Sequence, residues 1–352
     1  MIKLYAFLLG ALALYSYALV DPNITLVNND AWTVFRNSMV QLGYHQRPVS
    51  TAVYGVLVIL LFLFHVKLVG RYKKVSAMKI AIIVAFAGLL AYPFASHDLF
   101  NYIFDAKIFT YYHQNPYLHT ALDFPGDTMT RFMHWTHRTY PYGPSFLIMT
   151  LIPSFISFGK FILAYILFKI LIIGSYVGAV YYLNKWNKEW AVFFATQPLV
   201  IVDGLVNSHN DIIALSFGII GLYFVFHNDC VKRRIVLVFS GLIKYSTLPL
   251  IVATKKRDDP GTKIAFAGIA IVMVYLTFGR TIQPWYFLTP LVLIPYLYEQ
   301  VRKFYFFYFF VALSYVGYIY TGTWNNMFMY SILLVPLGAN TLYVIYAKRH
   351  NK

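Results

Sequence analysis

Long apolar runs recur along this chain, and they constrain its fold more than any other feature. The runs lie at about residues 4–20, 51–69, 80–95, 145–158, 161–183, 190–206, 212–227, 235–253, 264–279, 285–298, 304–320 and 327–346. A helix needs about 20 apolar residues to cross a bilayer, and several runs approach that length. Only 12% of the residues are charged, against roughly 25% in a typical soluble domain. The sequence therefore predicts an all-α, polytopic integral membrane protein, with residues 1–352 forming a single membrane domain.

Short basic clusters separate the apolar runs, and they predict how the chain lies in the membrane. The clusters consist of Lys3, Arg71, Lys73, Lys74, Lys79, Lys185, Lys188, Lys232, Arg233, Arg234, Lys255, Lys256, Arg257, Lys263, Arg302, Lys303, Lys348, Arg349 and Lys352. Lys and Arg concentrate in cytoplasmic loops of membrane proteins. The net charge of +16 is therefore attributed to membrane topology, and no nucleic-acid partner is predicted. We expect a prokaryotic plasma membrane with the functional face outward, or the lumenal face of the ER membrane in a eukaryote.

Simple alternation of twelve spans does not place all these clusters on one side. Two runs depart from an ordinary span: 145–158 is short and contains Pro153, and 235–253 carries Lys244 near its middle. Each is expected to enter and leave on the same side, the second as a two-legged hairpin. The prediction is 10 to 12 transmembrane segments. The first run is interpreted as a span because no small-residue cleavage site follows it, and a single cysteine, Cys230, excludes an internal disulfide.

The longest polar loop, residues 96–143, follows the third span and faces outward in this topology. Loops of this length in compact proteins are usually functional. If its first part is helical, Asp98, Asn101, Tyr102 and Asp105 share one face, because they are spaced i, i+3, i+4 and i+7. Two carboxylates there suit general-base chemistry or a divalent cation such as Mg²⁺ or Mn²⁺. The alternative is that they only solvate a helix end.

Two proline-rich segments, Asn115-Pro116-Tyr117 and Tyr140-Pro141-Tyr142-Gly143-Pro144, lie in the same loop. Prolines fix turns, and tyrosines anchor a chain at the membrane interface. A purely structural role is favoured for Asn115, Tyr117 and Tyr142 on these grounds alone.

A polar stretch, Asn207-Ser208-His209-Asn210-Asp211, opens the apolar run at 212–227. Its side chains could bind a phosphate or sugar hydroxyls, or they could cap a helix, since Asn and Ser are good N-caps. Both interpretations stay open.

Lys244 and Arg280 are the cations that best suit an anionic lipid ligand. Lys244 lies inside an apolar run, and the predicted hairpin would bring it to the outer face. Arg280 precedes Trp285 and Tyr286 and would lie on the same side. A phosphate contact by one or both is predicted, and snorkelling is the alternative for Lys244.

The histidines of the long loop, including His134 and His137 at i, i+3, could ligate a metal ion. No clear third ligand follows them in the sequence, and the region can equally be an aromatic belt around Trp135. A zinc site is therefore not favoured there.

Taken in order, these segments resemble the GT-C superfamily of membrane glycosyltransferases, and in particular the polyprenol-phosphomannose-dependent mannosyltransferases and their glycosylphosphatidylinositol mannosyltransferase relatives. The resemblance covers about residues 79–298. The segments that carry it are Ser96-His97-Asp98 with Tyr102 and Asp105, Asn115-Pro116-Tyr117, Tyr142-Gly143-Pro144, Gln197-Pro198-Leu199, His209-Asn210-Asp211, Gly241-Leu242-Ile243-Lys244 and Pro284-Trp285-Tyr286. Two departures concern the loop: it lacks the Asp-x-Asp of some relatives, which leaves the metal requirement open, and Ala106 follows Asp105 where relatives often have Gly.

The resemblance implies transfer of a hexose, mannose above all, from a polyprenyl-phosphate donor to a glycolipid or glycan acceptor at the outer face, with inversion. Asp98 matches the family's loop acid, which accepts the proton of the acceptor hydroxyl. The residues that the resemblance places around the donor phosphate and sugar are Lys244, Arg280, His209, Asn210, Asp211, Trp285 and Tyr286. Those expected to support the acceptor are His97, Asn101, Tyr102, Asp105, Asn115, Tyr117 and Tyr142, with Asp98 and Asp105 as ligands if a metal is used.

Two functions of other classes remain alternatives. One is a transporter or flippase of lipid-linked sugars, although such proteins tend to carry charges at the bilayer midplane and repeated halves. The other is a non-catalytic subunit of a glycosyltransferase complex. The carboxylates of the outer loop and the lack of a detectable internal repeat favour the enzyme over the transporter.

Overall fold

The computed structural model describes residues 1–350, and the side chains of residues 1–346. Every regular element in this part of the chain is helical, which confirms the all-α prediction. The α-helices are α1 (Ile2–Tyr15), α2 (Asp30–Val40), α3 (Arg47–Val69), α4 (Ala77–Leu90), α5 (Asp98–Thr110), α6 (Pro144–Ile156), α7 (Phe161–Trp186), α8 (Lys188–Thr196), α9 (Asp211–Phe226), α10 (Cys230–Ile243), α11 (Pro260–Phe278), α12 (Ile294–Lys303), α13 (Tyr305–Leu313), α14 (Val316–Thr321) and α15 (Asn326–His350). The 3-10 and π-helical segments are η1 (Ser16–Leu19), η2 (Gln41–His45), η3 (Tyr72–Lys74), η4 (Ala121–Asp123), η5 (Thr128–Phe132), η6 (Val200–Val206), η7 (Tyr245–Val252) and η8 (Pro284–Leu293).

Several helices are long and apolar enough to cross a membrane, so the protein is polytopic as predicted. Five pass this test alone, and they are Ile2–Leu19, Arg47–Val69, Phe161–Trp186, Pro260–Phe278 and Asn326–Tyr346. Two bent pairs pass as units, which brings the total to seven: α8 with η6, bent by 67°, and Pro284–Lys303 with Tyr305–Thr321, bent by 87°. Three shorter apolar helices, α4, α6 and α9, complete the apolar part.

The predicted runs at 285–298 and 304–320 form the two arms of one bent pair rather than two straight helices. Pro284 and Pro290 lie within η8, and Pro295 follows at the start of α12. Proline cannot donate the backbone hydrogen bond that a helix interior needs, so these residues favour the 3-10 geometry of η8. The bend between the two arms lies farther along the chain, between Lys303 and Tyr305.

The two irregular runs differ from ordinary spans in the structure as well. α6 has 13 residues, which at 1.5 Å per residue span about 20 Å, too short for the hydrocarbon core. The run at 235–253 divides into α10 and η7, which meet at Lys244, a residue with extended backbone (φ −144°, ψ 122°). A hydrogen bond of 2.8 Å between the Ser240 and Thr247 hydroxyls joins the two legs, confirming the hairpin.

Capping residues set the helix boundaries. The Ser76 hydroxyl accepts from the N–H of Lys79 at the start of α4, and the Asn187 side chain, between α7 and α8, accepts from the N–H groups of Glu189 and Trp190. Each satisfies N–H groups that a helix leaves free at its first turn. Pro144 begins α6 directly after Gly143, a position where its missing N–H costs nothing.

The buried centre consists of η6 and α9, which α4, α7 and α10 surround. Every residue of Val200–Val206 is buried. The outer helices are buried on one side only: in α11, for instance, Ile264, Ile271 and Phe278 are exposed. Apolar side chains on the outside are expected where lipid surrounds the protein.

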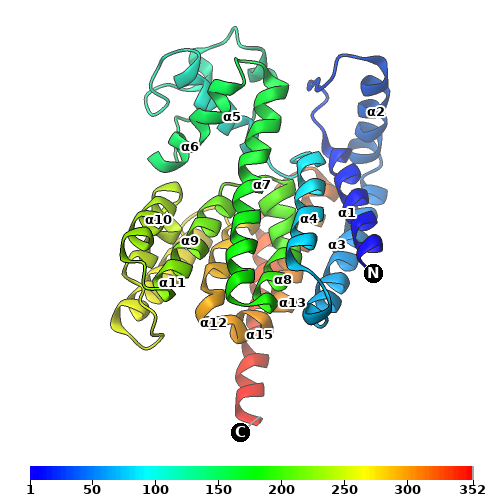
Figure 1. Cartoon of the computed structure of the whole chain (residues 1–352). Helices are drawn as coiled ribbons and strands as arrows, with labels where there is room; N and C mark the ends of the chain where they lie inside the picture. The colour runs from blue at the N-terminus through cyan, green and yellow to red at the C-terminus, as the bar shows by residue number, and fades with distance from the viewer. Residues whose placement is uncertain (351–352) are drawn as a thin grey trace.

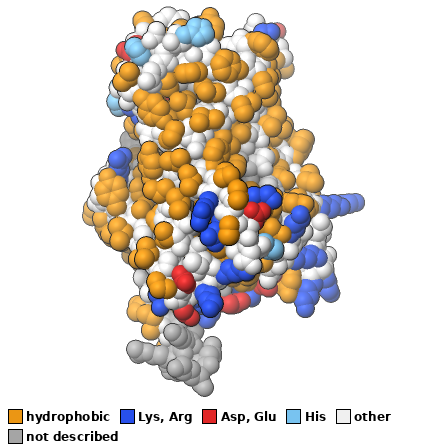
Figure 2. Space-filling view, turned by 60° about the vertical axis from the view of Figure 1, so that its left-hand side comes forward, with side chains coloured by type: hydrophobic (Ala, Val, Ile, Leu, Met, Phe, Trp, Pro, Cys, Tyr) orange, Lys and Arg blue, Asp and Glu red, His pale blue; other side chains and the backbone are white. Residues whose placement is uncertain are grey.

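The molecule has two dissimilar ends. α5, α6 and residues 111–143 form the loop end, at the top of Figure 1, and the turns at residues 70–76 and 253–260 lie at the opposite, basic end. α7 runs between the two. Figure 2 shows most Lys and Arg side chains of one face gathered over its lower half, with hydrophobic side chains above them. The charge separation predicted from sequence is therefore present in the fold.

Candidate active site

The polar face of α5 forms one wall of the candidate site. Asp98 begins this helix, and the Tyr102 hydroxyl, one turn later, lies 3.5 Å from Asp98 Oδ2. The same hydroxyl accepts a hydrogen bond of 3.3 Å from the N–H of Asn210. α5 is thus attached to the residues that precede α9, and the helix predicted over these residues is present.

The second wall is Asn207–Asp211, here called the polar turn, all five residues of which are buried. His209 Nδ1 lies 3.4 Å from Asp98 Oδ2. The His209 ring also stacks on Trp285, with ring centroids 3.9 Å apart and an interplanar angle of 21°. Asp98, His209 and Trp285, widely separated in sequence, therefore form a continuous row.

Buried charged side chains hold the polar turn from behind. Lys169 Nζ donates to Ser208 Oγ (3.3 Å) and to the Ala91 carbonyl (2.7 Å). The Asn207 amide donates to Asp203 (3.2 Å), and the Tyr315 hydroxyl also donates to that carboxylate. Sequence reasoning did not assign Lys169 or Asp203 to the site, although ionisable residues inside apolar runs are functional candidates by default.

Lys244 supplies the cation at the α10–η7 junction. It forms an ion pair with Asp211, whose side chain is 2% exposed. Its ammonium group also lies 5.8 Å from the centre of the Tyr286 ring. The predicted partners Asp211, Lys244 and Tyr286 are thus together. Arg280 is exposed, and its Nε donates to the Tyr275 hydroxyl (3.4 Å), so it lies at the edge of this group rather than beside Asp98.

Arg138 is a second cation of the site, and the sequence analysis missed it. Its guanidinium lies 5.5 Å from the centre of the Tyr142 ring, and its charge acts on both Asp98 and Asp105. Nη1 is buried without a hydrogen-bond partner. Arg138 belongs to no motif. Its position shortly before the Tyr140-Pro141-Tyr142 segment was the one sequence feature that could have pointed to it.

The two carboxyl groups of α5 differ in charge state. Burial raises the pKa of Asp98, but the hydrogen bond from His209 and the charges of His209, Arg138 and Lys244 outweigh it, and the net pKa lies below the usual value. Burial raises the pKa of Asp105 to about 7, with the charge of Asp98 adding to the effect and Arg138 opposing it. Asp98 is therefore an ionised base at neutral pH, whereas Asp105 is partly protonated.

Asn115 and Tyr117 shape the loop. Asn115 Oδ1 accepts from the N–H of Tyr117 (3.0 Å), and the Tyr117 hydroxyl donates to the Tyr142 carbonyl (3.2 Å). Tyr142 in turn packs edge-on against Tyr102, with centroids 5.3 Å apart. Of these three residues, Tyr142 is the one that contacts the polar face of α5.

Asn101 and His97 point toward the loop rather than toward the polar turn. The Asn101 amide donates to the Trp135 carbonyl (3.0 Å), and the His97 ring stacks on His134. Both residues connect α5 to residues 132–135.

Several buried polar atoms of the site have no partner within the described side chains. They are His209 Nε2, both amide atoms of Asn210, Asp211 Oδ1 and Asp105 Oδ2. Buried donors and acceptors in native proteins are nearly always satisfied, by protein, water or ligand. Hydroxyl and phosphate groups are complementary to this mixture, so the polar turn fits a hydrated, anionic or sugar-like ligand.

Asp98 and Asp105 do not fit a metal centre on their own. Among the described residues neither belongs to a group of three His, Cys, Asp or Glu side chains close enough to share an ion. The charge of Arg138 acts on Asp105, and Asp98 is beside His209. No step below uses a metal at this pair.

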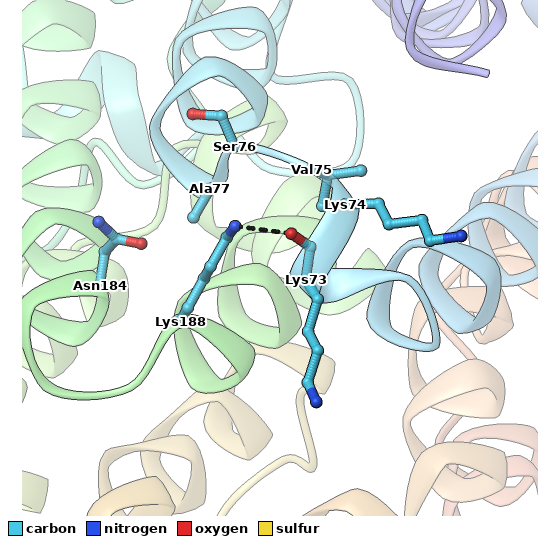
Figure 3. Close-up of a pocket in the computed structure, with 7 residues that line it drawn as sticks. All are labelled: Lys73, Lys74, Val75, Ser76, Ala77, Asn184 and Lys188. Atoms are coloured by element: carbon cyan, nitrogen blue, oxygen red, sulfur yellow. Dashed lines mark hydrogen bonds between the residues drawn. The ribbon is translucent and has the colours of Figure 1, made fainter.

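A separate hollow of ≈ 500 Å³ lies at the basic end, and we call it the basic hollow. Figure 3 shows its lining, which consists of Lys73, Lys74, Val75, Ser76, Ala77, Asn184 and Lys188. Lys188 Nζ donates to the Lys73 carbonyl (3.1 Å). The lining of the basic hollow contains no carboxylate.

Comparison with known proteins gives one match. Residues 6–255 match the MptA_B family, described as alpha-(1->6)-mannopyranosyltransferase, N-terminal domain. No curated protein and no solved structure matches. The match spans most of the chain and includes Asp98, the polar turn and Lys244. The chain therefore belongs to the alpha-(1->6)-mannopyranosyltransferase family, and the protein is a membrane-embedded glycosyltransferase of the mannosyltransferase class.

Proposed function

We propose that this protein transfers a mannose from a polyprenyl-phosphate-linked donor to a hydroxyl group of a glycolipid or glycan, and that an α-(1→6) bond is formed. The observation that carries the proposal is an ionised carboxylate, Asp98, facing His209, Arg138 and Lys244. A base beside cations is what displacement of a phosphate by a hydroxyl requires.

Asp98 accepts the proton of the acceptor hydroxyl as that oxygen attacks the anomeric carbon. His209 fixes the carboxylate, and Trp285 fixes the His209 ring by stacking. A single displacement inverts the anomeric centre, so an α-linked product implies a β-linked donor.

Lys244 and Arg138 stabilise the leaving lipid phosphate. Lys244 is on the side of Asp98 nearest the polar turn, and Arg138 comes from the loop. Fixed positive charges in a site of low dielectric lower the energy of the departing oxyanion. The unpartnered atoms of His209, Asn210 and Asp211 would hold sugar hydroxyls.

The loop end is assigned to the outer face of a plasma membrane, or to the lumenal face of the ER. The support is the position of the basic clusters at the opposite end, because Lys and Arg prefer the cytoplasmic side. The polyprenyl tail would run along exposed apolar helix surfaces such as that of α11.

The test uses purified protein, radiolabelled polyprenyl-phosphate-mannose and a membrane glycolipid extract. Asp98→Asn is nearly isosteric and removes the base. We expect it to lower kcat by about 10²- to 10⁴-fold, the usual contribution of a general base. Asp123→Asn is the control, since Asp123 is an exposed carboxylate of the same loop.

Each other outcome points to an alternative function. Unchanged transfer in Asp98→Asn membranes would indicate a non-catalytic subunit. Absence of both transfer and donor hydrolysis, also with the glucose- and arabinose-linked donors, would favour a transporter or flippase. Equal losses in Asp98→Asn and Asp123→Asn would show that the loop fold, not the base, had been disturbed.

A further inference from the structure

Three potential metal ligands meet at the loop end, beside the candidate active site but outside it. Ligand atoms of Asp21, His97 and His134 all lie within 4.8 Å of one another. They are the one such group of three among the described residues. Asp21 follows η1, His97 directly precedes α5, and His134 lies beyond η5, so three separate segments converge here.

The side chains of His97 and Asp21 are oriented by hydrogen bonds that leave an atom free to bind a metal ion. Nδ1 of His97 is buried without a hydrogen-bond partner, while the ring is held by a hydrogen bond with the backbone of Phe132. Asp21 Oδ1 accepts from the N–H of Asn23 (2.7 Å), which orients the carboxylate. A hydrogen bond that orients a metal ligand is the usual supporting arrangement in metal sites.

Binding of an ion by both histidines requires one ring to turn. The rings of His97 and His134 are stacked, with centroids 3.5 Å apart and planes inclined by 16°, whereas an ion lies in the plane of each ring that binds it. His134 is exposed, so its ring can turn about its side-chain bonds. A tetrahedral zinc site with bonds of about 2.0–2.2 Å places its ligand atoms roughly 3.3–3.6 Å apart. The three ligand atoms therefore need to approach one another only slightly.

We propose that Asp21, His97 and His134 bind one Zn²⁺ ion, with water as the fourth ligand. Two imidazoles and a carboxylate suit zinc, whereas Mg²⁺ prefers oxygen ligands alone. The ion joins the segment after η1 to the long loop and to the residue preceding Asp98. The site lies outside the polar turn, and the proposal does not rest on the proposed function.

Zinc binding to tag-free protein in detergent, measured by calorimetry and by metal analysis after gel filtration, tests this site. We expect one Zn²⁺ per chain and a rise in Tm on zinc addition, because a ligand that binds only the folded state stabilises it. Mg²⁺ at the same concentration should do neither. Co²⁺ should give the absorption bands of tetrahedral coordination.

His134→Ala and Asp21→Asn should each weaken zinc affinity by at least about tenfold and abolish the rise in Tm. His137→Ala is the matched control: His137 is exposed, three residues from His134, and outside the group. It should bind zinc as the unmodified protein does. Substoichiometric zinc in the unmodified protein, or equal affinities of the His134→Ala and His137→Ala variants, would overturn the proposal.

Discussion

The polar turn and the basic hollow are both polar regions of an otherwise apolar protein, and they differ in almost every other respect. Groups around the polar turn are buried, carry both signs of charge and come from distant segments. The lysines of the basic hollow are of one sign, and they come from two turns at the surface (Figure 3). The hollow of ≈ 500 Å³ therefore lies where only cations gather. Convergence of buried charges, rather than hollowness, locates the candidate active site.

The largest effect should come from breaking the buried charge pair. Lys244→Gln removes the cation and leaves the Asp211 carboxylate buried without it, which typically costs about 3–5 kcal/mol. We expect kcat to fall by about 10²-fold or more and Tm to fall clearly, measured by donor turnover and by thermal unfolding.

The double variant Lys244→Gln with Asp211→Asn separates the two effects. It should recover much of the stability, because no unpaired charge remains, but not the turnover. Full activity in Lys244→Gln alone would show that the cation plays no part in the reaction.

Replacing Arg138 should have a smaller effect, and its signature is a pH shift. Arg138 lowers the pKa of Asp98, so in Arg138→Gln the carboxylate takes up a proton at higher pH. The acidic limb of kcat/KM should then move upward. At neutral pH, where Asp98 stays ionised, the loss of a cation beside the leaving phosphate should lower kcat/KM by about tenfold, equivalent to about 1.4 kcal/mol. Arg131 is an exposed arginine of the same loop, and Arg131→Gln is the control: it should leave the pH profile of kcat/KM unchanged. An unchanged acidic limb in Arg138→Gln would exclude this electrostatic role.

The smallest effect is expected at the basic hollow. Lys188→Ala removes one hydrogen bond to a backbone carbonyl at an exposed site, and such changes usually alter stability by less than about 0.5 kcal/mol. Transfer should stay within about twofold of the unmodified protein in the same assay. A tenfold loss of transfer activity in Lys188→Ala would show that the basic hollow also takes part in the reaction.

Several residues singled out in the sequence lie together in the structure, whereas the bends of the spans were not predicted. Asp98, His209, Asp211 and Lys244 lie at run boundaries or inside runs, where polar side chains are costly unless they serve a purpose, and the structure brings them together. Hydropathy locates apolar runs but not their bends, which is why 285–298 and 304–320 turned out to be arms of one pair.

What the sequence could not supply is the set of contacts between remote segments. Arg138 is one arginine among several in a loop, and only the folded position of Tyr142 and α5 gives it a role. Asp21 and His134 lie more than a hundred residues apart, so no local spacing could connect them with His97.

Gly143 has a consequence for the order of events in catalysis. A Cβ at this position would lie 1.9 Å from the Leu242 carbonyl oxygen, so the backbone at the start of α6 rests directly on the residues before Lys244. The loop that carries Tyr142 and the segment that carries Lys244 cannot shift independently. A donor seated at Lys244 would fix the surface that receives the acceptor, and the coupling is reciprocal by thermodynamic necessity. Each substrate is thus expected to tighten the binding of the other, and steady-state kinetics should be sequential, not ping-pong.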